Sequence, residues 1–200
     1  MFQTIRWCLG LLAICFALTA QASNFSREDW ESVTQAARRA AQRGDADGQF
    51  ILGLIYAKSV ASEDHPEAAQ WFRKAAEQGH AEARFSLGLM YFTGRGVAQS
   101  DAEAARWFRL AAEQGNLNAQ MILGVMSFQG RGVAQSDAEA AQWLRKAAEQ
   151  GDAEAQLILG QMYREGRGVP QSDAEAVQWF RKAAEGGNED ARKALKVLEK

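Results

Sequence analysis

Few residues of this 200-residue chain have the types and spacing that support chemistry. It has two histidines, His65 and His80, and neither has a carboxylate or a second histidine at the spacing of a metal site. It also lacks the Gly-x-Ser-x-Gly and Ser-x-x-Lys motifs of common serine nucleophiles. We therefore expect no catalytic residue, no metal and no cofactor, and we interpret the chain as a protein that is not an enzyme.

Two other residue patterns that could suggest chemistry have structural interpretations. Asp101 and Glu103 open a helical pattern, where carboxylates stabilise the positive end of the helix dipole. Gly94 and Gly96 resemble a fragment of a phosphate-binding loop, but no strand pattern precedes them. Because the same glycine pair recurs in register further along the chain, it indicates the turn of a helical hairpin.

Residues 1–22 are typical of a secretory signal peptide. Arg6 precedes an apolar stretch, and the small residues Ala20 and Ala22 favour cleavage before Ser23. The stretch is shorter than the roughly 20 residues of a spanning helix, so we expect an exported protein, periplasmic or secreted, without stable membrane insertion. Cleavage would remove both cysteines, Cys8 and Cys15, and with them any disulfide or thiolate site.

The charge of the chain is small and evenly mixed. It carries 23 Lys and Arg against 25 Asp and Glu, a formal net charge of −2 that becomes −3 when Arg6 leaves with the signal. No basic face stands out, so the sequence argues against binding to nucleic acid or to an anionic membrane. We expect a monomer whose partner is a protein or a peptide.

The chain is organised by a repeat of 36 residues. The segment 116–151 matches 80–115 at 24 of 36 positions, and 152–187 matches 116–151 equally well. Each unit has the pattern of two helices joined by a Gly-x-Gly turn, the second opened by a Ser-x-x-Glu capping box. A glycine recurs in the middle of the first helix and predicts that the second helix approaches closely there. The tryptophans also recur at this interval, and we interpret them as core: Trp71, Trp107, Trp143 and Trp179.

The sequence predicts an all-α fold, an α/α superhelical solenoid of tandem hairpins with a capping helix at each end. Repeat 1 is one residue shorter than the others and lacks the Gly-x-Gly turn. The expected divisions are a signal peptide 1–22, an N-terminal capping helix 23–44, repeat 1 at 45–79, repeat 2 at 80–115, repeat 3 at 116–151, repeat 4 at 152–187, and a C-terminal capping helix 188–200.

The repeat resembles the Sel-1-like repeat, a relative of the tetratricopeptide repeat. The resemblance is carried by Ala81-Glu82-Ala83, Leu87-Gly88-x-Met90-Tyr91, Gly94-Arg95-Gly96-Val97 and Ala105-x-Trp107-Phe108-x-x-Ala111-Ala112-x-x-Gly115. It implies a superhelix whose first helices line a concave surface, and an adaptor function linked in secreted members to envelope assembly and host-cell contact. One cysteine-rich branch is associated with β-lactam binding or hydrolysis. That branch, or binding of a peptidoglycan ligand, is the alternative function, and the missing cysteines count against it.

Variable residues on the first helices are the candidate partner-binding surface. If Leu87 points inward, positions such as 82, 86, 89 and 93 point away from it. Phe85, Met121 and Leu157 lie in a neighbouring stripe, and they either line this surface or pack adjacent first helices together. The candidate binding residues are Ile51, Leu54, Lys58, Phe85, Ser86, Leu89, Thr93, Ile122, Val125, Gln129, Ile158, Gln161 and Glu165.

Overall fold

The protein is described by a computed structural model that covers residues 26–58 and 65–198. The predicted signal peptide, residues 1–22, lies outside the described residues. All regular secondary structure in the described ranges is helical, which confirms the all-α solenoid of tandem hairpins.

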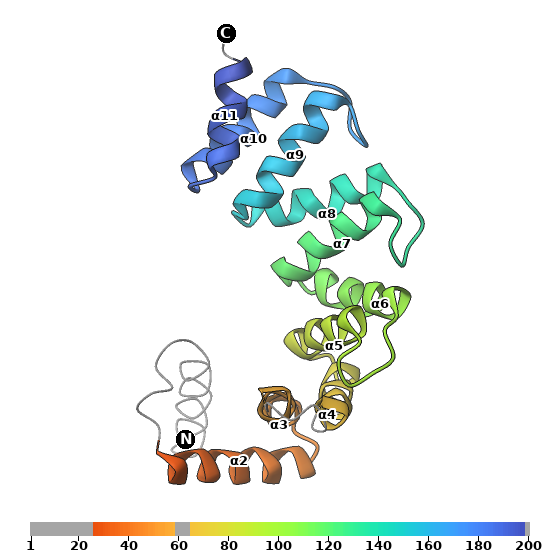
Figure 1. The fold of residues 1–200 in the computed structure, drawn as a ribbon, viewed down its shortest axis with the longest axis vertical. Helices are drawn as coiled ribbons and strands as arrows, with labels where there is room; N and C mark the ends of the chain where they lie inside the picture. Colours follow the sequence, from red (N-terminus) through yellow and green to blue (C-terminus); the bar gives the residue numbers. More distant parts are fainter. Residues whose placement is uncertain (1–25, 59–64, 199–200) are drawn as a thin grey trace. The chain divides into compact units, whose positions relative to one another are not determined.

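The described residues form two compact units, the first ending at His80 and the second beginning at Ala81. The helices of unit 1 are α2 (Arg27–Gln42), α3 (Ala46–Lys58) and α4 (His65–Glu77). The helices of unit 2 are α5 (Ala81–Thr93), α6 (Asp101–Glu113), α7 (Leu117–Gln129), α8 (Asp137–Glu149), α9 (Ala153–Glu165), α10 (Asp173–Glu185) and α11 (Glu189–Leu198). Within unit 2 the hairpins α5–α6, α7–α8 and α9–α10 follow one another in chain order, and α11 packs on α10 (Figure 1).

The second helix of each hairpin in unit 2 begins at a serine cap, but the predicted capping box is only half formed. The Ser100 hydroxyl accepts the Glu103 N–H, whereas the Ser100 N–H donates to the Tyr91 carbonyl of the first helix at 2.9 Å. Because that carbonyl already satisfies the cap N–H, the glutamate carboxylate is not needed there. The prediction of a reciprocal box was therefore wrong for these helices. The same hairpin-closing bond joins Ser136 to Ser127 and Ser172 to Tyr163.

The glycine in the middle of each first helix permits close helix packing, as the sequence predicts. A Cβ atom added to Gly88 would lie 2.7 Å from the ring of Phe108, and one added to Gly53 would lie 2.6 Å from the ring of Phe72. Gly124 and Gly160 face Leu144 and Phe180 in the same way. The large side chain of the second helix therefore occupies the space that a first-helix side chain would fill.

The Gly-Arg-Gly turns stack on the preceding hairpin of unit 2. Gly130 and Gly132 have positive φ, and a Cβ on Gly132 would lie 2.2 Å from the Asp101 carbonyl oxygen. Between them, Arg131 donates to Asp101 Oδ2 at 2.7 Å and places its guanidinium 4.0 Å from the centroid of the Phe92 ring. The hydrogen bond with Asp101 raises the pKa of Arg131. The next turn repeats these contacts with Arg167, Asp137 and Phe128.

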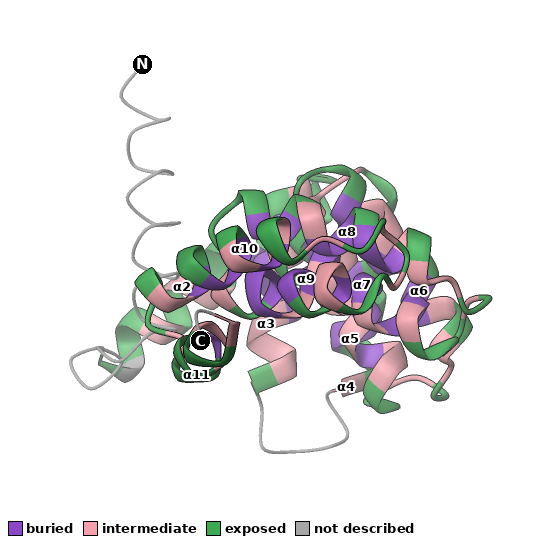
Figure 2. Cartoon of the chain, turned by 90° about the horizontal axis from the view of Figure 1, so that it is seen from above, coloured by how far each residue is buried: buried purple, intermediate pink, exposed green. Residues whose placement is uncertain are grey.

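The core of unit 2 is a series of small alanines around large side chains. Phe108 and Leu123 are fully buried in a cluster that also holds Trp143, which is 9% exposed. Trp107 and Trp179 are similarly buried, which confirms the interpretation of these three tryptophans as core. Trp71 is half-buried. The buried residues of unit 2 lie along the sides of its helices that face one another, and the turns are mostly exposed (Figure 2).

The helix α2 in unit 1 is capped at its N-terminus by Ser26. The Ser26 hydroxyl accepts the Asp29 N–H, and the Asp29 carboxylate accepts the Ser26 N–H at 2.9 Å, so this capping box is complete. These hydrogen bonds to Ser26 lower the pKa of Asp29. Helix α2 packs on α3 through a cluster that contains Ala37, Ala41 and Ile51.

Candidate partner-binding surface

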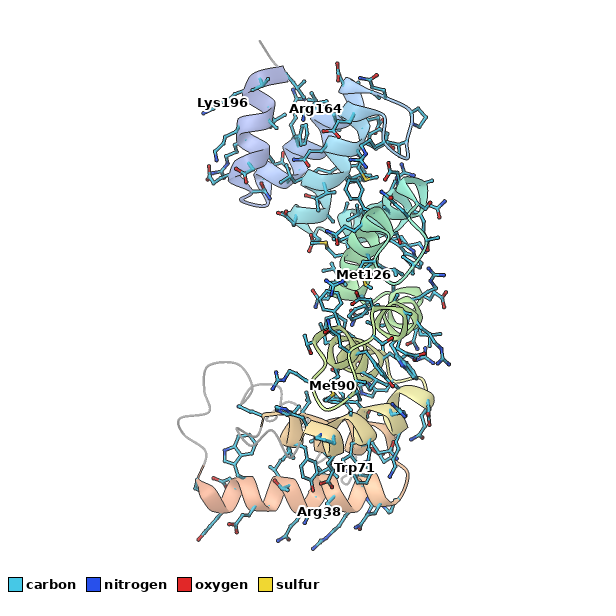
Figure 3. All side chains as sticks on the ribbon, turned by 45° about the vertical axis from the view of Figure 1, so that its right-hand side comes forward. Arg38, Trp71, Met90, Met126, Arg164 and Lys196 are labelled. Atoms are coloured by element: carbon cyan, nitrogen blue, oxygen red, sulfur yellow. The ribbon has the colours of Figure 1, made fainter. Side chains whose placement is uncertain are left out.

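Each first helix of unit 2 has one buried side and one side that faces away from its partner helix. In α5, Ala83 and Leu87 are fully buried against α6, whereas Glu82 and Thr93 are exposed. Met90 in α5 and Met126 in α7 occupy equivalent buried positions 36 residues apart (Figure 3). We name the opposite side the inner surface of unit 2. It comprises Glu82, Ser86, Leu89 and Thr93 of α5, Asn118, Ile122, Val125 and Gln129 of α7, Glu154, Ile158, Gln161 and Glu165 of α9, and Asp190, Ala194 and Val197 of α11.

Exposure along the inner surface follows one pattern in α5 and α7. The residues at the two ends of each helix are exposed, such as Asn118 and Gln129, and the two between them are half-buried, such as Ile122 and Val125. The pattern changes in α9, where Gln161 is exposed at the position of Val125. A strip of partly accessible apolar side chains therefore runs between polar edges on α5 and α7.

The structure brings ten of the predicted binding residues together in unit 2, on α5, α7 and α9. Nine of them belong to the inner surface. The tenth, Phe85, is half-buried, and its ring lies 5.7 Å from that of Phe108, so it contributes to core packing. Leu89, Ile122 and Ile158 are half-buried and also pack partly against the core clusters of unit 2. Thr93 uses its hydroxyl to donate to the Leu89 carbonyl at 2.7 Å.

The other three predicted residues lie on α3 in unit 1, where α2 changes their surroundings. Ile51 is 6% exposed and packs against Ala37 and Ala41 of α2, so it is a core residue of this unit. Leu54 is half-buried and Lys58 is exposed, with its ammonium 5.7 Å from the centroid of the Trp30 ring. In unit 1 the surface that includes Ile51 is therefore partly covered by the terminal helix.

The alternative interpretation of the neighbouring stripe accounts for its members in unit 2. Leu157 is 6% exposed and belongs to a buried cluster with Phe180, and Met121 packs against the core around Leu144. Together with Phe85, they pack the helices and form the base beneath the inner surface.

Sequence reasoning overlooked the contribution of α11 to this surface. Val197 is 69% exposed and lies 36 residues after Gln161, in the register of Leu89 and Val125. Ala194 and Asp190 continue the two neighbouring rows. The repeat period could have identified them, because α11 keeps the register of a first helix even though no second helix follows it among the described residues.

His80 has an acidic and an aromatic neighbour in unit 1. His80 Nε2 lies 3.4 Å from Asp47 Oδ1, and the His80 ring packs 4.5 Å from that of Phe50. In residues 26–58 and 65–198 no three His, Cys, Asp or Glu residues gather where they could hold a metal ion. Within the same ranges, no helix combines the length and the apolarity needed to cross a membrane.

Comparison with known proteins places this geometry in a family. The Sel1 repeat model matches residues 46–80, 81–116, 117–152 and 153–188. No curated protein matches the chain significantly. A Sel1 repeat protein from Oxalobacter formigenes is 34% identical over 92% of this chain and 74% of its own, with a TM-score of 0.80.

Two further solved structures are similar. The c5321 protein, a protective antigen of uropathogenic Escherichia coli with an SLR fold, is 41% identical with a TM-score of 0.73. The match covers 79% of this chain but only 34% of c5321, so the chain spans about a third of that relative. Helicobacter pylori cysteine rich protein B is 29% identical over 69% of this chain and 98% of its own, with a TM-score of 0.53. With four matched repeats covering most of its length, the chain belongs to the Sel1 repeat family.

Proposed function

We propose that this protein is an exported, non-enzymatic scaffold that binds a peptide or protein partner on the inner surface of unit 2. Sel1 repeat proteins are generally protein-interaction scaffolds. The observation that supports this assignment for the inner surface is its residue variation on a constant frame. Leu89, Val125, Gln161 and Val197 differ in type at one repeat position, while the buried positions beneath them stay apolar.

Residues that make few packing contacts can change type with little loss of stability, so their side chains can be selected for contact with a partner. Val125 is half-buried and partly accessible, and Val197 is largely exposed, so a partner that covers both would remove apolar area from water. The first helices that carry them are held by buried contacts, so the surface is formed before the partner arrives. Such preorganisation lowers the entropic cost of binding.

Partner capture with matched variants tests this proposal. Wild-type protein and a Val125→Glu, Val197→Glu double variant are used as bait in extracts of the host cell envelope. The control is Ala102→Glu, Ala138→Glu, which adds the same charge at exposed positions of α6 and α8. We expect the inner-surface variant to lose specific partners that the control keeps. If both variants remain folded by circular dichroism and capture the same proteins, the inner surface is not the binding site.

Export is the second part of the proposal, and it is tested separately. The N-terminal pattern ending at Ala22 supports it, as does the similarity to c5321, a protective antigen. Intact mass and N-terminal sequencing of the protein recovered from the periplasm or medium should show a chain that begins at Ser23. Recovery of the uncleaved chain from the cytoplasm alone would contradict export.

A further inference from the structure

The ionisable residues of the inner surface of unit 2 all carry the same sign of charge. Four of its fifteen residues are ionisable, all of them are exposed acids, and none is a lysine or an arginine. They are Glu82 on α5, Glu154 and Glu165 on α9, and Asp190 on α11. The surface therefore presents negative charge beside its apolar strip.

Four basic side chains of unit 2 are held on its second helices and in its turns. Lys146 and Lys182 lie about 4.2 Å above the rings of Trp143 and Trp179 on the second helices. Arg131 and Arg167 are held between an aspartate and a phenylalanine ring in the turns.

Two basic residues on the first-helix side neutralise the inner acids only in part. Arg164 is 3.6 Å from Glu165, and Lys193 is 2.8 Å from Asp190. Both are exposed pairs within one helix, and such pairs contribute little because water and salt screen them. Glu154 accepts a hydrogen bond from the Asn188 amide at 3.2 Å, which leaves its charge in place.

Acids and apolar side chains occur together across the surface. Helix α7 has no ionisable residue between Leu117 and Gln129, and it presents Ile122 and Val125. Acids stand on α5 before it and on α9 after it, and α11 then presents the exposed Val197. The surface of unit 2 therefore combines acids on α5, α9 and α11 with apolar side chains on all four of these helices.

We infer that the inner surface of unit 2 accepts a segment of a protein partner that carries both lysine or arginine and large apolar residues. This inference rests on the proposed function and specifies the partner. Apolar contacts with Val125 and Val197 supply affinity, and the acids supply specificity and a faster association rate.

A designed peptide tests this chemistry directly. The probe is a fluorescently labelled peptide, Lys-Ser-Ser-Leu-Ser-Ser-Lys-Ser-Ser-Leu, titrated with the full chain at low salt. One comparison peptide replaces each lysine with glutamate, and another replaces each leucine with serine. We expect the lysine–leucine peptide to bind at least tenfold more tightly than either, with a difference that shrinks in 0.5 M salt as the charges are screened.

Variants of the protein place the binding on the inner surface. Glu154→Gln with Glu165→Gln should weaken lysine–leucine binding at least threefold without weakening binding of the glutamate peptide, and Val125→Ser should weaken lysine–leucine binding as well. If the glutamate peptide binds equally well and Val125→Ser weakens both, the surface binds peptides and the charge inference is wrong. Binding that no variant alters would place the site elsewhere and overturn the inference.

Two remaining outcomes also count against the inference. No binding of the lysine–leucine peptide up to 1 mM overturns it, and the capture experiment then decides the proposed function on its own. Sedimentation of the chain alone shows whether a second copy occupies the surface. A dimer that the Val125→Glu substitution abolishes would assign the surface to self-association.

Discussion

Both units contain helical hairpins, but equivalent residues of the first helices differ in burial between the units. In unit 1, α2 packs on α3 and buries Ile51 to 6% exposure. In unit 2, the equivalent residues Ser86, Ile122 and Ile158 are half-buried, and the rows around them remain accessible. The comparison indicates that packing of the additional helix α2 buries a row of the first helix that stays partly accessible in unit 2.

The units also differ in the residues around their turns. In unit 2, Arg131 and Arg167 each bind an aspartate and cover a phenylalanine ring of the preceding hairpin. Repeat 1 has Ala57 and His65 at the positions of that phenylalanine and aspartate. The regular turns of unit 2 are therefore part of how its hairpins stack, and this stacking holds the inner surface in register.

The largest effect should follow from loss of a core ring in unit 2. Phe108 is fully buried and fills the space above Gly88, so Phe108→Ala should lower the free energy of unfolding by about 3–5 kcal/mol. Urea unfolding followed by circular dichroism measures the change, and hydrogen exchange should locate it in α5–α8. A loss below about 1 kcal/mol would show that the α5–α6 interface is loosely packed.

The contrast between the two first helices is tested by matched truncations. Ile51→Ala should cost about 2–5 kcal/mol because Ile51 is core in unit 1. Val125→Ala removes two partly accessible methyl groups and should cost about 1 kcal/mol or less. Thermal unfolding of both variants provides the comparison. Equal losses would mean that Val125 is core as well and is not available to a partner.

The stacked turns are tested by a pair of glycine substitutions. Gly44 in unit 1 has φ +86° and no atom within 4 Å of an added Cβ, so Gly44→Ala should cost only the left-handed strain of about 1–2 kcal/mol. Gly132→Ala has the same strain and also a clash with the Asp101 carbonyl. It should therefore be the more destabilising change in chemical denaturation. A Gly132→Ala protein as stable as Gly44→Ala would contradict the turn stacking.

The smallest effect concerns the cap of α2. Hydrogen bonds from Ser26 lower the pKa of Asp29 in the folded state, so this group stabilises the fold above its ordinary pKa of about 3.8. That contribution should disappear as the pH falls through the lowered value. Comparing Asp29→Asn with wild type should show a small stability difference at neutral pH that vanishes in acid. A difference that persists in acid would exclude the carboxylate as its source.

Much of the fold could be predicted because the same packing signals recur in several repeats. The 36-residue period and the mid-helix glycines predicted the hairpins, and Gly88 and Gly160 confirm the close helix approach. The reciprocal capping box was mispredicted because the Ser100 N–H reaches a carbonyl nine residues earlier in the chain. A local motif cannot show such a bond, because it depends on how the hairpin closes.

The candidate surface could be predicted in part. The rotation of 100° per residue correctly placed Val125 on a partly accessible side of α7, whereas the half-buried Leu89 also packs against the core. It could not show that α2 would cover Ile51, because that contact depends on where the terminal helix packs. Nor was the exposed Val197 of α11 predicted to join the surface, because residues 188–200 were interpreted only as a capping helix.

The central claim is that a partner contacts the inner surface of unit 2, and site-specific photocrosslinking tests it most directly. A benzophenone amino acid is placed at Val125 on α7, or at the exposed Gln142 on α8 as the control, and the expressing cells are irradiated. The account predicts a specific crosslinked protein from position 125 and none from position 142. Adducts from position 142 alone, or the same adduct from both positions, would contradict it.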